Sequence, residues 1–263
     1  MPQPRVLILR APGTNCDVET AFAFETAGAI AERVHIGRVL ERADVLADYQ
    51  ILCIPGGFSY GDDVAAGRIF GNQIRHHLAE RMQAFRDEGK LILGICNGFQ
   101  VLIKSGLLLD EADGPQATLT WNDSGQFEDR WVRLGVRGEL SVFLKGIDQM
   151  YLPVAHAEGK LVTRDEVTLA RLDAAGQLPL RYLPLDNSAN GTGDQVEVPF
   201  PDNPNGSQLA AAAMCDESGR VLGLMPHPER HIDPVQHPRW TRGEGGEQGD
   251  GLAVFQNAVG YFA

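Results

Sequence analysis

The sequence lacks several features that would point to particular classes of protein. Its four cysteines are scattered through 263 residues without a C-x-x-C pair, at Cys16, Cys53, Cys96 and Cys215. This spacing argues against a disulfide framework, and free thiols are the better interpretation. No apolar run approaches the roughly 20 residues that span a bilayer. The short apolar run near the N-terminus has no small-residue cleavage site after it, so we expect a cytoplasmic protein with no membrane partner.

Basic residues are also scarce. The chain has 23 Lys and Arg residues against 35 Asp and Glu, which gives a formal net charge of −12. A nucleic-acid-binding protein would carry a basic face, so we expect no nucleic-acid partner. The hydrophobic content of 43% and the charged content of 22% are typical of globular proteins, and the length allows a substantial core.

The first half of the chain alternates short apolar runs with stretches of helical spacing. Gly28 and Gly89 stand where two helices should end. Strands separated by helices of this length indicate an α/β fold with a mostly parallel sheet covered on both faces, a three-layer arrangement. The strands are expected at 6–10, 31–36, 51–55 and 91–95, and the helices from Thr14 or Asn15 to Thr26 and over 72–88.

Beyond Leu107 the pattern changes to strands without intervening helices, which predicts a hairpin or an added sheet layer. No internal repeat or linker divides the chain, so a single domain over residues 1–263 is expected. The sequence predicts strands at 131–136, 149–156 and 220–226, a loop rich in Pro, Gly, Asn and Asp at 184–208, a polar connection over 231–250, and a final helix at 252–262.

A candidate nucleophile stands between an expected strand and an expected helix. The run Gly94-Ile95-Cys96-Asn97-Gly98 has the form G-x-C-x-G, the cysteine version of the nucleophile elbow. Glycines are needed there because the strand turns sharply into the helix. The turn places the thiol at a helix N-terminus, whose partial positive charge favours the thiolate. A buried, inert cysteine would show the same five letters, but the strand-then-helix setting favours a nucleophile.

A candidate base follows the last expected strand of the core. Parallel strands deliver their carboxyl ends to one edge of a sheet, so His227 can lie near Cys96 despite the distance in sequence. Glu229 can then bind the other ring nitrogen and fix the tautomer. His227 and His231 have a spacing that resembles a metal-binding pair, but the neighbouring prolines disfavour the required helix. Because no cysteine or acidic cluster completes the ligand set, we expect no metal site.

These motifs resemble the class I glutamine amidotransferases. GICNGFQ (94–100) matches the nucleophile motif of that family, and HPE (227–229) matches the rest of its catalytic triad. The fold implied by the resemblance is a three-layer, flavodoxin-like α/β core. Further blocks resemble the branch of the family that serves de novo purine biosynthesis, and they span nearly the whole chain: PGTNCD (12–17), PGGFSYGDD (55–63), AHAEGK (155–160), NPNGS (203–207) and VLGLMPHPER (221–230).

The resemblance implies a catalytic cycle and a role for each triad member. Cys96 is the nucleophile, His227 the general base and Glu229 the residue that orients the imidazole. The thiolate attacks the amide of glutamine, ammonia leaves, and the γ-glutamyl thioester is hydrolysed to glutamate. His227 first protonates the departing ammonia and later activates water.

The resemblance also implies substrate-binding groups and partners. The backbone N–H groups of Gly57 and Asn97 would stabilise the oxyanion, and Gln100 would help to hold glutamine. Gly56 and Gly57 are expected in a flexible loop that a partner can press into place. No P-loop or other ATP-binding motif is evident. We therefore expect no cofactor in this chain, with ATP and Mg on a partner synthetase subunit that binds formylglycinamide ribonucleotide. A small third subunit is a further candidate partner.

Two other functions remain as alternatives. A hydrolase or deglycase related to intracellular proteases would share the elbow but usually has histidine directly after the cysteine, where this chain has Asn97. A non-catalytic assembly subunit would keep the fold and lose a triad member, whereas all three are present. The cysteines other than Cys96 are expected to contribute to stability at most.

Overall fold

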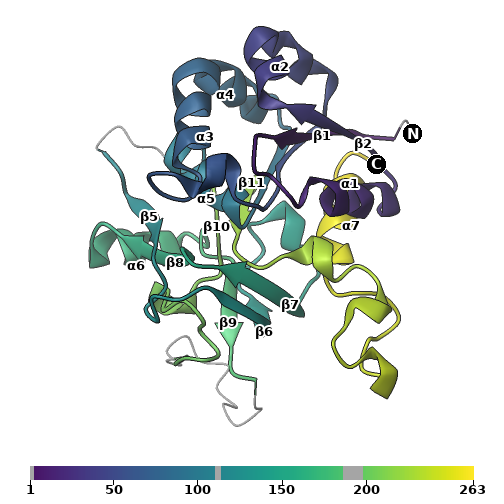
Figure 1. Ribbon diagram of the computed structural model, residues 1–263, viewed down its shortest axis with the longest axis vertical. Coiled ribbons are helices and arrows are strands. Elements are labelled where there is room, and N and C mark those ends of the chain that lie inside the picture. The colour runs from purple at the N-terminus through teal and green to yellow at the C-terminus, as the bar shows by residue number, and fades with distance from the viewer. Residues whose placement is uncertain (1–2, 110–113, 186–197) are drawn as a thin grey trace.

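The computed structural model describes residues 3–109, 114–185 and 198–263 (Figure 1). At its centre lies a six-stranded sheet in the order β10-β11-β4-β3-β1-β2. Neighbouring strands run parallel except β10, which is antiparallel to β11. The predicted mostly parallel sheet is therefore confirmed. Its strands are β1 (Arg5–Arg10), β2 (Ile30–His35), β3 (Ile51–Ile54), β4 (Leu91–Ile95), β10 (Ala213–Cys215) and β11 (Val221–Leu224).

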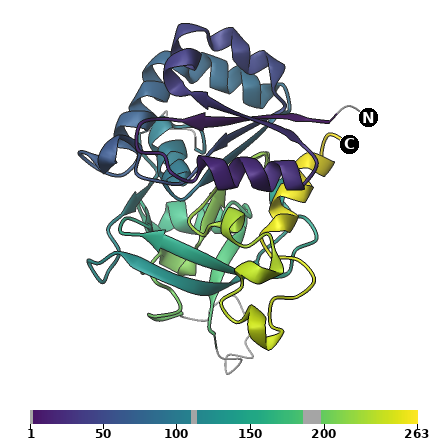
Figure 2. The same cartoon turned by 45° about the vertical axis from the view of Figure 1, so that its right-hand side comes forward.

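The inner strands of this sheet are apolar because both of their faces are covered. Every residue of β3, β4 and β11 is buried, whereas the edge strand β2 alternates irregularly between exposed and buried positions. This is the pattern expected of a parallel sheet between two helical layers. Figures 1 and 2 show helices on both faces of the sheet. They are α1 (Asp17–Thr26), α2 (Ile36–Glu41), α3 (Arg68–Gln73), α4 (Ala79–Asp87), α5 (Asn97–Ser105) and α7 (Leu252–Gly260). A further helix, α6 (Glu166–Ala174), lies away from this sheet.

The helix predicted over 72–88 is interrupted. A π-helical segment, Ile74–Leu78, separates α3 from α4. No proline or glycine within the segment marks it in the sequence, so the uniform helical spacing hid the break. Helix α3 also begins earlier than predicted, at Arg68, and it packs closely against α5 at Gly71. A Cβ atom at Gly71 would lie 3.0 Å from Lys104 Cβ.

The second half of the chain adds two antiparallel sheets, which agrees with the added sheet layer expected from the sequence. The expectation of no helix among these strands was wrong, because α6 lies between β8 and β9 in the chain. The larger has the order β7-β6-β9 and the smaller pairs β5 with β8. A backbone hydrogen bond of 2.9 Å from His227 N to Pro153 O ties β7 to the segment that follows β11. This contact brings the added layer against the edge of the central sheet. The strands are β5 (Ala117–Thr120), β6 (Glu128–Val136), β7 (Gln149–His156), β8 (Lys160–Thr163) and β9 (Leu180–Leu183).

The rest of the second half contains the last core strand, the final helix and the long connections. The last core strand and the final helix are present with slightly shorter bounds than predicted. Residues 186–197 of the loop predicted at 184–208 lie outside the described residues. The connection over 231–250 contains short 3-10 turns at Pro234–Gln236 and Trp240–Arg242 and no strand. Within the described ranges, no helix has the length and apolar character needed to cross a bilayer.

Candidate active site

Cys96 lies on the sharp turn between β4 and α5. Its backbone is in a strained left-handed conformation, with φ 51° and ψ −105°. A Cβ atom at Gly98 would lie 1.8 Å from Ile54 O, and one at Gly94 would lie 2.6 Å from Gly98 O. Both glycines are therefore needed for the helix to pack against the sheet at this turn. The strand-to-helix turn that the G-x-C-x-G pattern predicted is present.

A methyl group at Gly98 should therefore be costly. We expect Gly98→Ala to lower the free energy of unfolding by about 1–3 kcal/mol or more, because the clash is with a backbone carbonyl that cannot rotate away. Urea unfolding followed by circular dichroism measures the change. The control is Gly260→Ala at the end of α7, where no heavy atom lies within 4 Å of the added carbon. Equal stability of the two variants would contradict the close approach at the elbow.

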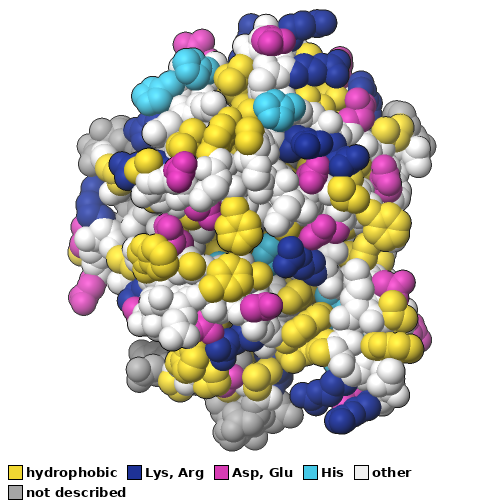
Figure 3. Space-filling view, in the orientation of Figure 1, with side chains coloured by type: hydrophobic (Ala, Val, Ile, Leu, Met, Phe, Trp, Pro, Cys, Tyr) yellow, Lys and Arg dark blue, Asp and Glu magenta, His cyan; other side chains and the backbone are white. Residues whose placement is uncertain are grey.

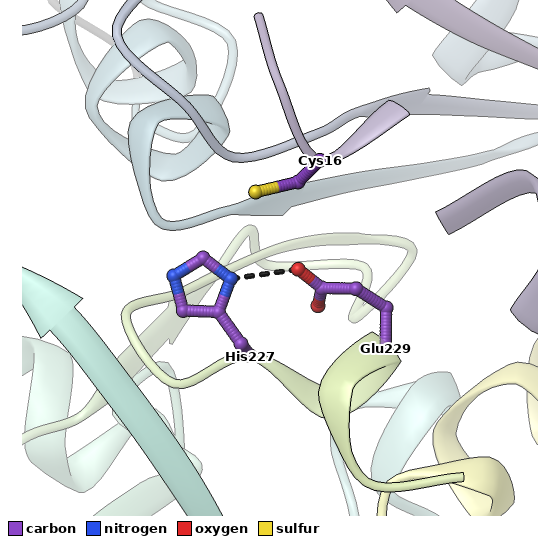
Figure 4. A group of neighbouring side chains, drawn as sticks. All are labelled: Cys16, His227 and Glu229. Carbon is purple, nitrogen blue, oxygen red and sulfur yellow. Dashed lines mark hydrogen bonds and ion pairs between the residues drawn. The ribbon is translucent and has the colours of Figure 1, made fainter. Parts of the chain in front are cut away.

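His227 and Glu229 form a buried pair at the turn after β11. The Nδ1 atom of His227 donates to Glu229 Oε1 over 2.7 Å, and the two residues are 2% and 1% exposed. Burial disfavours the imidazolium, but the charges of Glu229 and Cys96 outweigh it and hold the pKa of His227 well above its ordinary value. With Nδ1 bound to the carboxylate, Nε2 is left without a partner among the described residues. Figure 4 shows the imidazole and the carboxylate pointing toward each other.

The three triad candidates from the sequence are brought to one place. Cys96 and His227 line the same pocket, and the charge of Cys96 helps to raise the pKa of His227. The Sγ atom of Cys96 also lies 3.5 Å from Ala155 O in β7. The arrangement can therefore support a thiolate–imidazolium pair in which a buried carboxylate stabilises the imidazolium.

Asn97 and Gln100 have a different setting from the triad. The Nδ2 atom of Asn97 donates to Asp62 Oδ1 over 3.0 Å and to Gln100 Oε1 over 2.9 Å, and its Oδ1 atom accepts from Ser59 N at 3.3 Å. Gln100 Nε2 donates to Glu158 O over 2.6 Å. These buried amides tie the elbow to the loop after β3 and to the loop after β7. The Gln100 side chain is occupied by these contacts and does not line the pocket around Cys96.

Gly57 lines the pocket but does not lie in a free loop. Hydrogen bonds from Phe58 N to Gly13 O at 3.0 Å and from Cys16 N to Gly56 O at 3.3 Å hold the segment against the loop after β1. A Cβ atom at Gly57, where φ is 135°, would lie 2.7 Å from Asn15 N. In this structure the Gly56-Gly57 segment is therefore held in place, and its movement on docking stays a prediction.

Backbone strain lies just after that segment. The positive φ angles of Tyr60 (57°), Asp62 (54°) and Val64 (72°) are unfavourable for residues other than glycine. Burial, with Glu158 adding to it, raises the pKa of Asp62 to about 6 even though Gly67 and Asn97 donate to its carboxylate. A strained, partly buried acidic loop thus contacts the elbow through Asn97. Strain of this kind is concentrated at functional sites.

The pocket around Cys96 has a volume of about 210 Å³. It is open to solvent, and in Figure 3 the middle of the visible face carries hydrophobic side chains beside basic and acidic ones. Phe58 and Phe127 line it with stacked rings whose centroids lie 6.3 Å apart. Asp129 and Arg230 give the walls opposite charges. A small zwitterionic molecule matches both the size and the charges of this pocket.

Cys16 was missed as a site residue. It lines the pocket, is 1% exposed, and accepts a hydrogen bond from Arg230 Nη2 at 3.1 Å. It also contacts the His227 ring and contributes to its raised pKa. The inference that no cysteine accompanies His227 was wrong, because Cys16 follows β1 and β1 ends at the same sheet edge as β4. That shared edge was the one available signal.

A second buried histidine lies near the triad but cannot replace His227. Burial, together with the positive charge of His227, lowers the pKa of His156 to about 3. Its Nδ1 atom lies 3.1 Å from Asn122 Oδ1. His156 is therefore neutral at physiological pH and unsuited to protonate a leaving group.

Comparison with known proteins gives a consistent assignment. Residues 3–262 match the family model described as a CobB/CobQ-like glutamine amidotransferase domain. A Dehalococcoides mccartyi protein named phosphoribosylformylglycinamidine synthase subunit PurQ is 48% identical over 261 residues, covering 98% of each chain. A protein of the same name from Archaeoglobus fulgidus is 40% identical, over 98% of this chain and 96% of its own.

Solved structures agree with the sequence matches. A chain of the structure of PurLQS from Thermotoga maritima superposes with a TM-score of 0.74 and 32% identity, covering 100% of both chains. A glutamine amidotransferase from the same organism superposes with a TM-score of 0.53 at 15% identity, and that likeness concerns the fold alone. The flavodoxin-like, three-layer class expected from the sequence is confirmed by these folds.

Proposed function

The chain belongs to the CobB/CobQ-like glutamine amidotransferase family, and we propose that it is the glutaminase subunit of phosphoribosylformylglycinamidine synthase. Relatives of that name match it along nearly their whole length. The observation that carries the activity is the pocket in which Cys96 meets the buried His227–Glu229 pair. Ammonia released there passes to the synthetase subunit in purine biosynthesis.

In the proposed cycle, the Cys96 thiolate attacks the side-chain amide carbon of glutamine. The developing oxyanion is placed near the N–H groups of Gly57 and Asn97, the second of which heads α5 and has no acceptor within the helix. His227, which is charged and held by Glu229, protonates the leaving ammonia. Its departure leaves a γ-glutamyl thioester on Cys96. The same imidazole, now neutral, takes a proton from water and glutamate leaves.

The remaining assignments follow from this activity. We propose that residues 1–263 act as one glutamine amidotransferase domain without a cofactor of its own. ATP and Mg are assigned to the synthetase subunit, and a small third subunit completes the list of partners. A cytoplasmic location suits a thiolate nucleophile and four unpaired cysteines, because that compartment keeps thiols reduced.

The alternatives have less support. Asn97 occupies the position where deglycase-type relatives usually carry histidine. A non-catalytic subunit would not need the buried charge pair of His227 and Glu229, since burying charges is costly unless they have a use.

The function is tested by reconstituting the synthetase with and without this chain. Glutamine should support synthesis only when the chain is present, whereas ammonium salt should support it in both cases. Glutamate and ADP are measured in parallel. Glutamine use by the synthetase alone, or no glutamine use by the complex when ammonium works, would refute the assignment.

We expect the isolated chain to be a poor glutaminase. The loop after β3 is strained at Tyr60, Asp62 and Val64 and is tied to the elbow through Asn97, so a partner that presses on it can move an oxyanion donor. Removing one such donor typically costs ~10²–10³ in rate. Glutamate release should therefore rise by about 10²–10³ when synthetase, its nucleotide substrate and ATP are added at fixed concentration of this chain.

A second experiment distinguishes activation by docking alone from activation that needs the substrates of the synthetase. In it, synthetase is added without ATP and without its nucleotide substrate. Full activity of the chain alone would overturn the gating and leave the triad standing. Because residues 56–58 are pinned, the loop over 59–67 is the segment we expect to change, which hydrogen exchange with and without partner would report.

A further inference from the structure

Three side chains of different ligand types converge beside the nucleophile. A sulfur of Cys16, a ring nitrogen of His227 and a carboxylate oxygen of Glu229 all lie within 4.8 Å of one another, and all three residues are buried. Figure 4 shows them pointing toward a common centre from the loop after β1 and the turn after β11. Thiolate, imidazole and carboxylate are the ligands that Zn²⁺ prefers in proteins. Within the described part of the chain, no other group of three or more such residues is found.

One acceptor atom of this group lacks a hydrogen-bond partner among the described residues. Oε2 of Glu229 is buried and unpaired. An unsatisfied buried acceptor costs free energy that a bound cation would recover. Glu229 is only 1% exposed, so solvent does not reach it readily.

The local charge is compatible with a divalent ion. A thiolate at Cys16 and the carboxylate of Glu229 would together contribute two negative charges. The nearby Arg230 donates to the Cys16 sulfur at 3.1 Å, which favours the thiolate, and its own charge is paired with Glu19 at 3.2 Å.

We propose that Cys16, His227 and Glu229 form an inhibitory site for Zn²⁺ or a similar thiophilic divalent cation. The consequence rests on the proposed function: a cation held here takes the imidazole and the carboxylate that the glutaminase needs. A fourth ligand can come from a water molecule in the pocket. Cys16 would then make the glutaminase sensitive to the cation. Synthesis from added ammonia does not use this site and should continue.

Direct binding tests the site without any glutaminase assay. Co²⁺ is titrated into the full chain, and a thiolate-to-cobalt absorption band with one ion bound per chain is expected; Zn²⁺ should displace it. Cys16→Ser should weaken binding by at least about 10–100-fold. The matched control Cys215→Ser changes another buried cysteine and should bind as the unaltered chain does. Cys96→Ala should keep the band.

Inhibition is measured in the reconstituted complex as glutamate release, relative to each variant's own metal-free rate. Zn²⁺ that inhibits the unaltered complex should spare Cys16→Ser, a chelator should restore activity, and synthesis from ammonium salt should persist. Equal cobalt affinity in Cys16→Ser, or loss of the band in Cys96→Ala, would overturn the proposal. If Cys16→Ser does not fold, Glu229→Gln takes its place in the titration. Because the cobalt titration measures binding alone, it would still test the metal site if the glutaminase assignment failed.

Discussion

Replacing Cys96 with alanine should abolish glutamine-dependent synthesis by the assembled enzyme and leave synthesis from ammonium salt intact. Alanine fits the elbow, because it is smaller than cysteine and the left-handed backbone at this position already carries a Cβ atom. Only the nucleophile is lost. Removing the nucleophile of a catalytic triad costs on the order of 10⁶ in kcat. We expect a loss of that size in glutamate release.

The matched control is Cys53→Ala, which removes a sulfur from the buried strand β3. Its glutamine-dependent rate should stay within a few-fold of that of the unaltered chain, since the side chain lies outside the pocket. Cys16 also contacts His227, so a double replacement of Cys16 and Cys96 completes the series. Glutaminase activity in Cys96→Ala that disappears in the double variant would move the nucleophile to Cys16.

Much of the central sheet was predictable because its inner strands are short and mostly apolar runs. β4 was predicted with its observed bounds, Leu91–Ile95, and β7 likewise, Gln149–His156. The elbow was predictable as well, because an apolar strand, two glycines and a helix in this order allow few backbone conformations. The triad could be inferred because parallel strands end at one edge, so two distant motifs had to meet there.

Other features of the site depend on contacts that no local pattern records. Arg230 and Cys16 are separated by 214 positions and meet only because β1 and β11 end at the same sheet edge. Gln100 has the spacing of a pocket residue, but Asn97 and the Glu158 carbonyl satisfy its side chain elsewhere. The pinning of Gly57 likewise comes from backbone hydrogen bonds to the loop after β1. The sequence therefore identifies the candidate site residues, but the contacts of their side chains depend on how the folded chain packs.

The short strands of the second half were harder to predict for a different reason. β5 and β8 pair with each other, and each has only four residues with alternating burial. β9 also has four residues, and its Arg181 is 8% exposed and pairs with Asp173 of α6. A buried arginine makes such a segment look like loop, and only the ion pair in the folded chain stabilises it there.

Replacing Glu229 should slow the reaction less than replacing the nucleophile does, but more than the loss of an ordinary hydrogen bond would. Glu229→Gln is expected to slow glutamate release by ~10²–10⁴, because an amide can donate to Nδ1 and so favour the wrong tautomer of His227. Some thioester should still form, since the imidazole remains. His227→Ala should be more severe because it removes the proton donor itself. Acid-quenched samples analysed by mass spectrometry would count the thioester directly.

The pH dependence distinguishes an electrostatic role from a purely positional one. Glu229 is the largest contribution that raises the pKa of His227, against the opposing effect of burial. Without that charge the imidazolium should lose its proton at lower pH, so the alkaline limb of the rate profile should shift to lower pH in Glu229→Gln. The control is Glu19→Gln, a neighbouring carboxylate that pairs with Arg230 at 3.2 Å. Its profile should keep its alkaline limb. An unchanged turnover in Glu229→Ala would mean that another carboxylate, or none, serves the histidine.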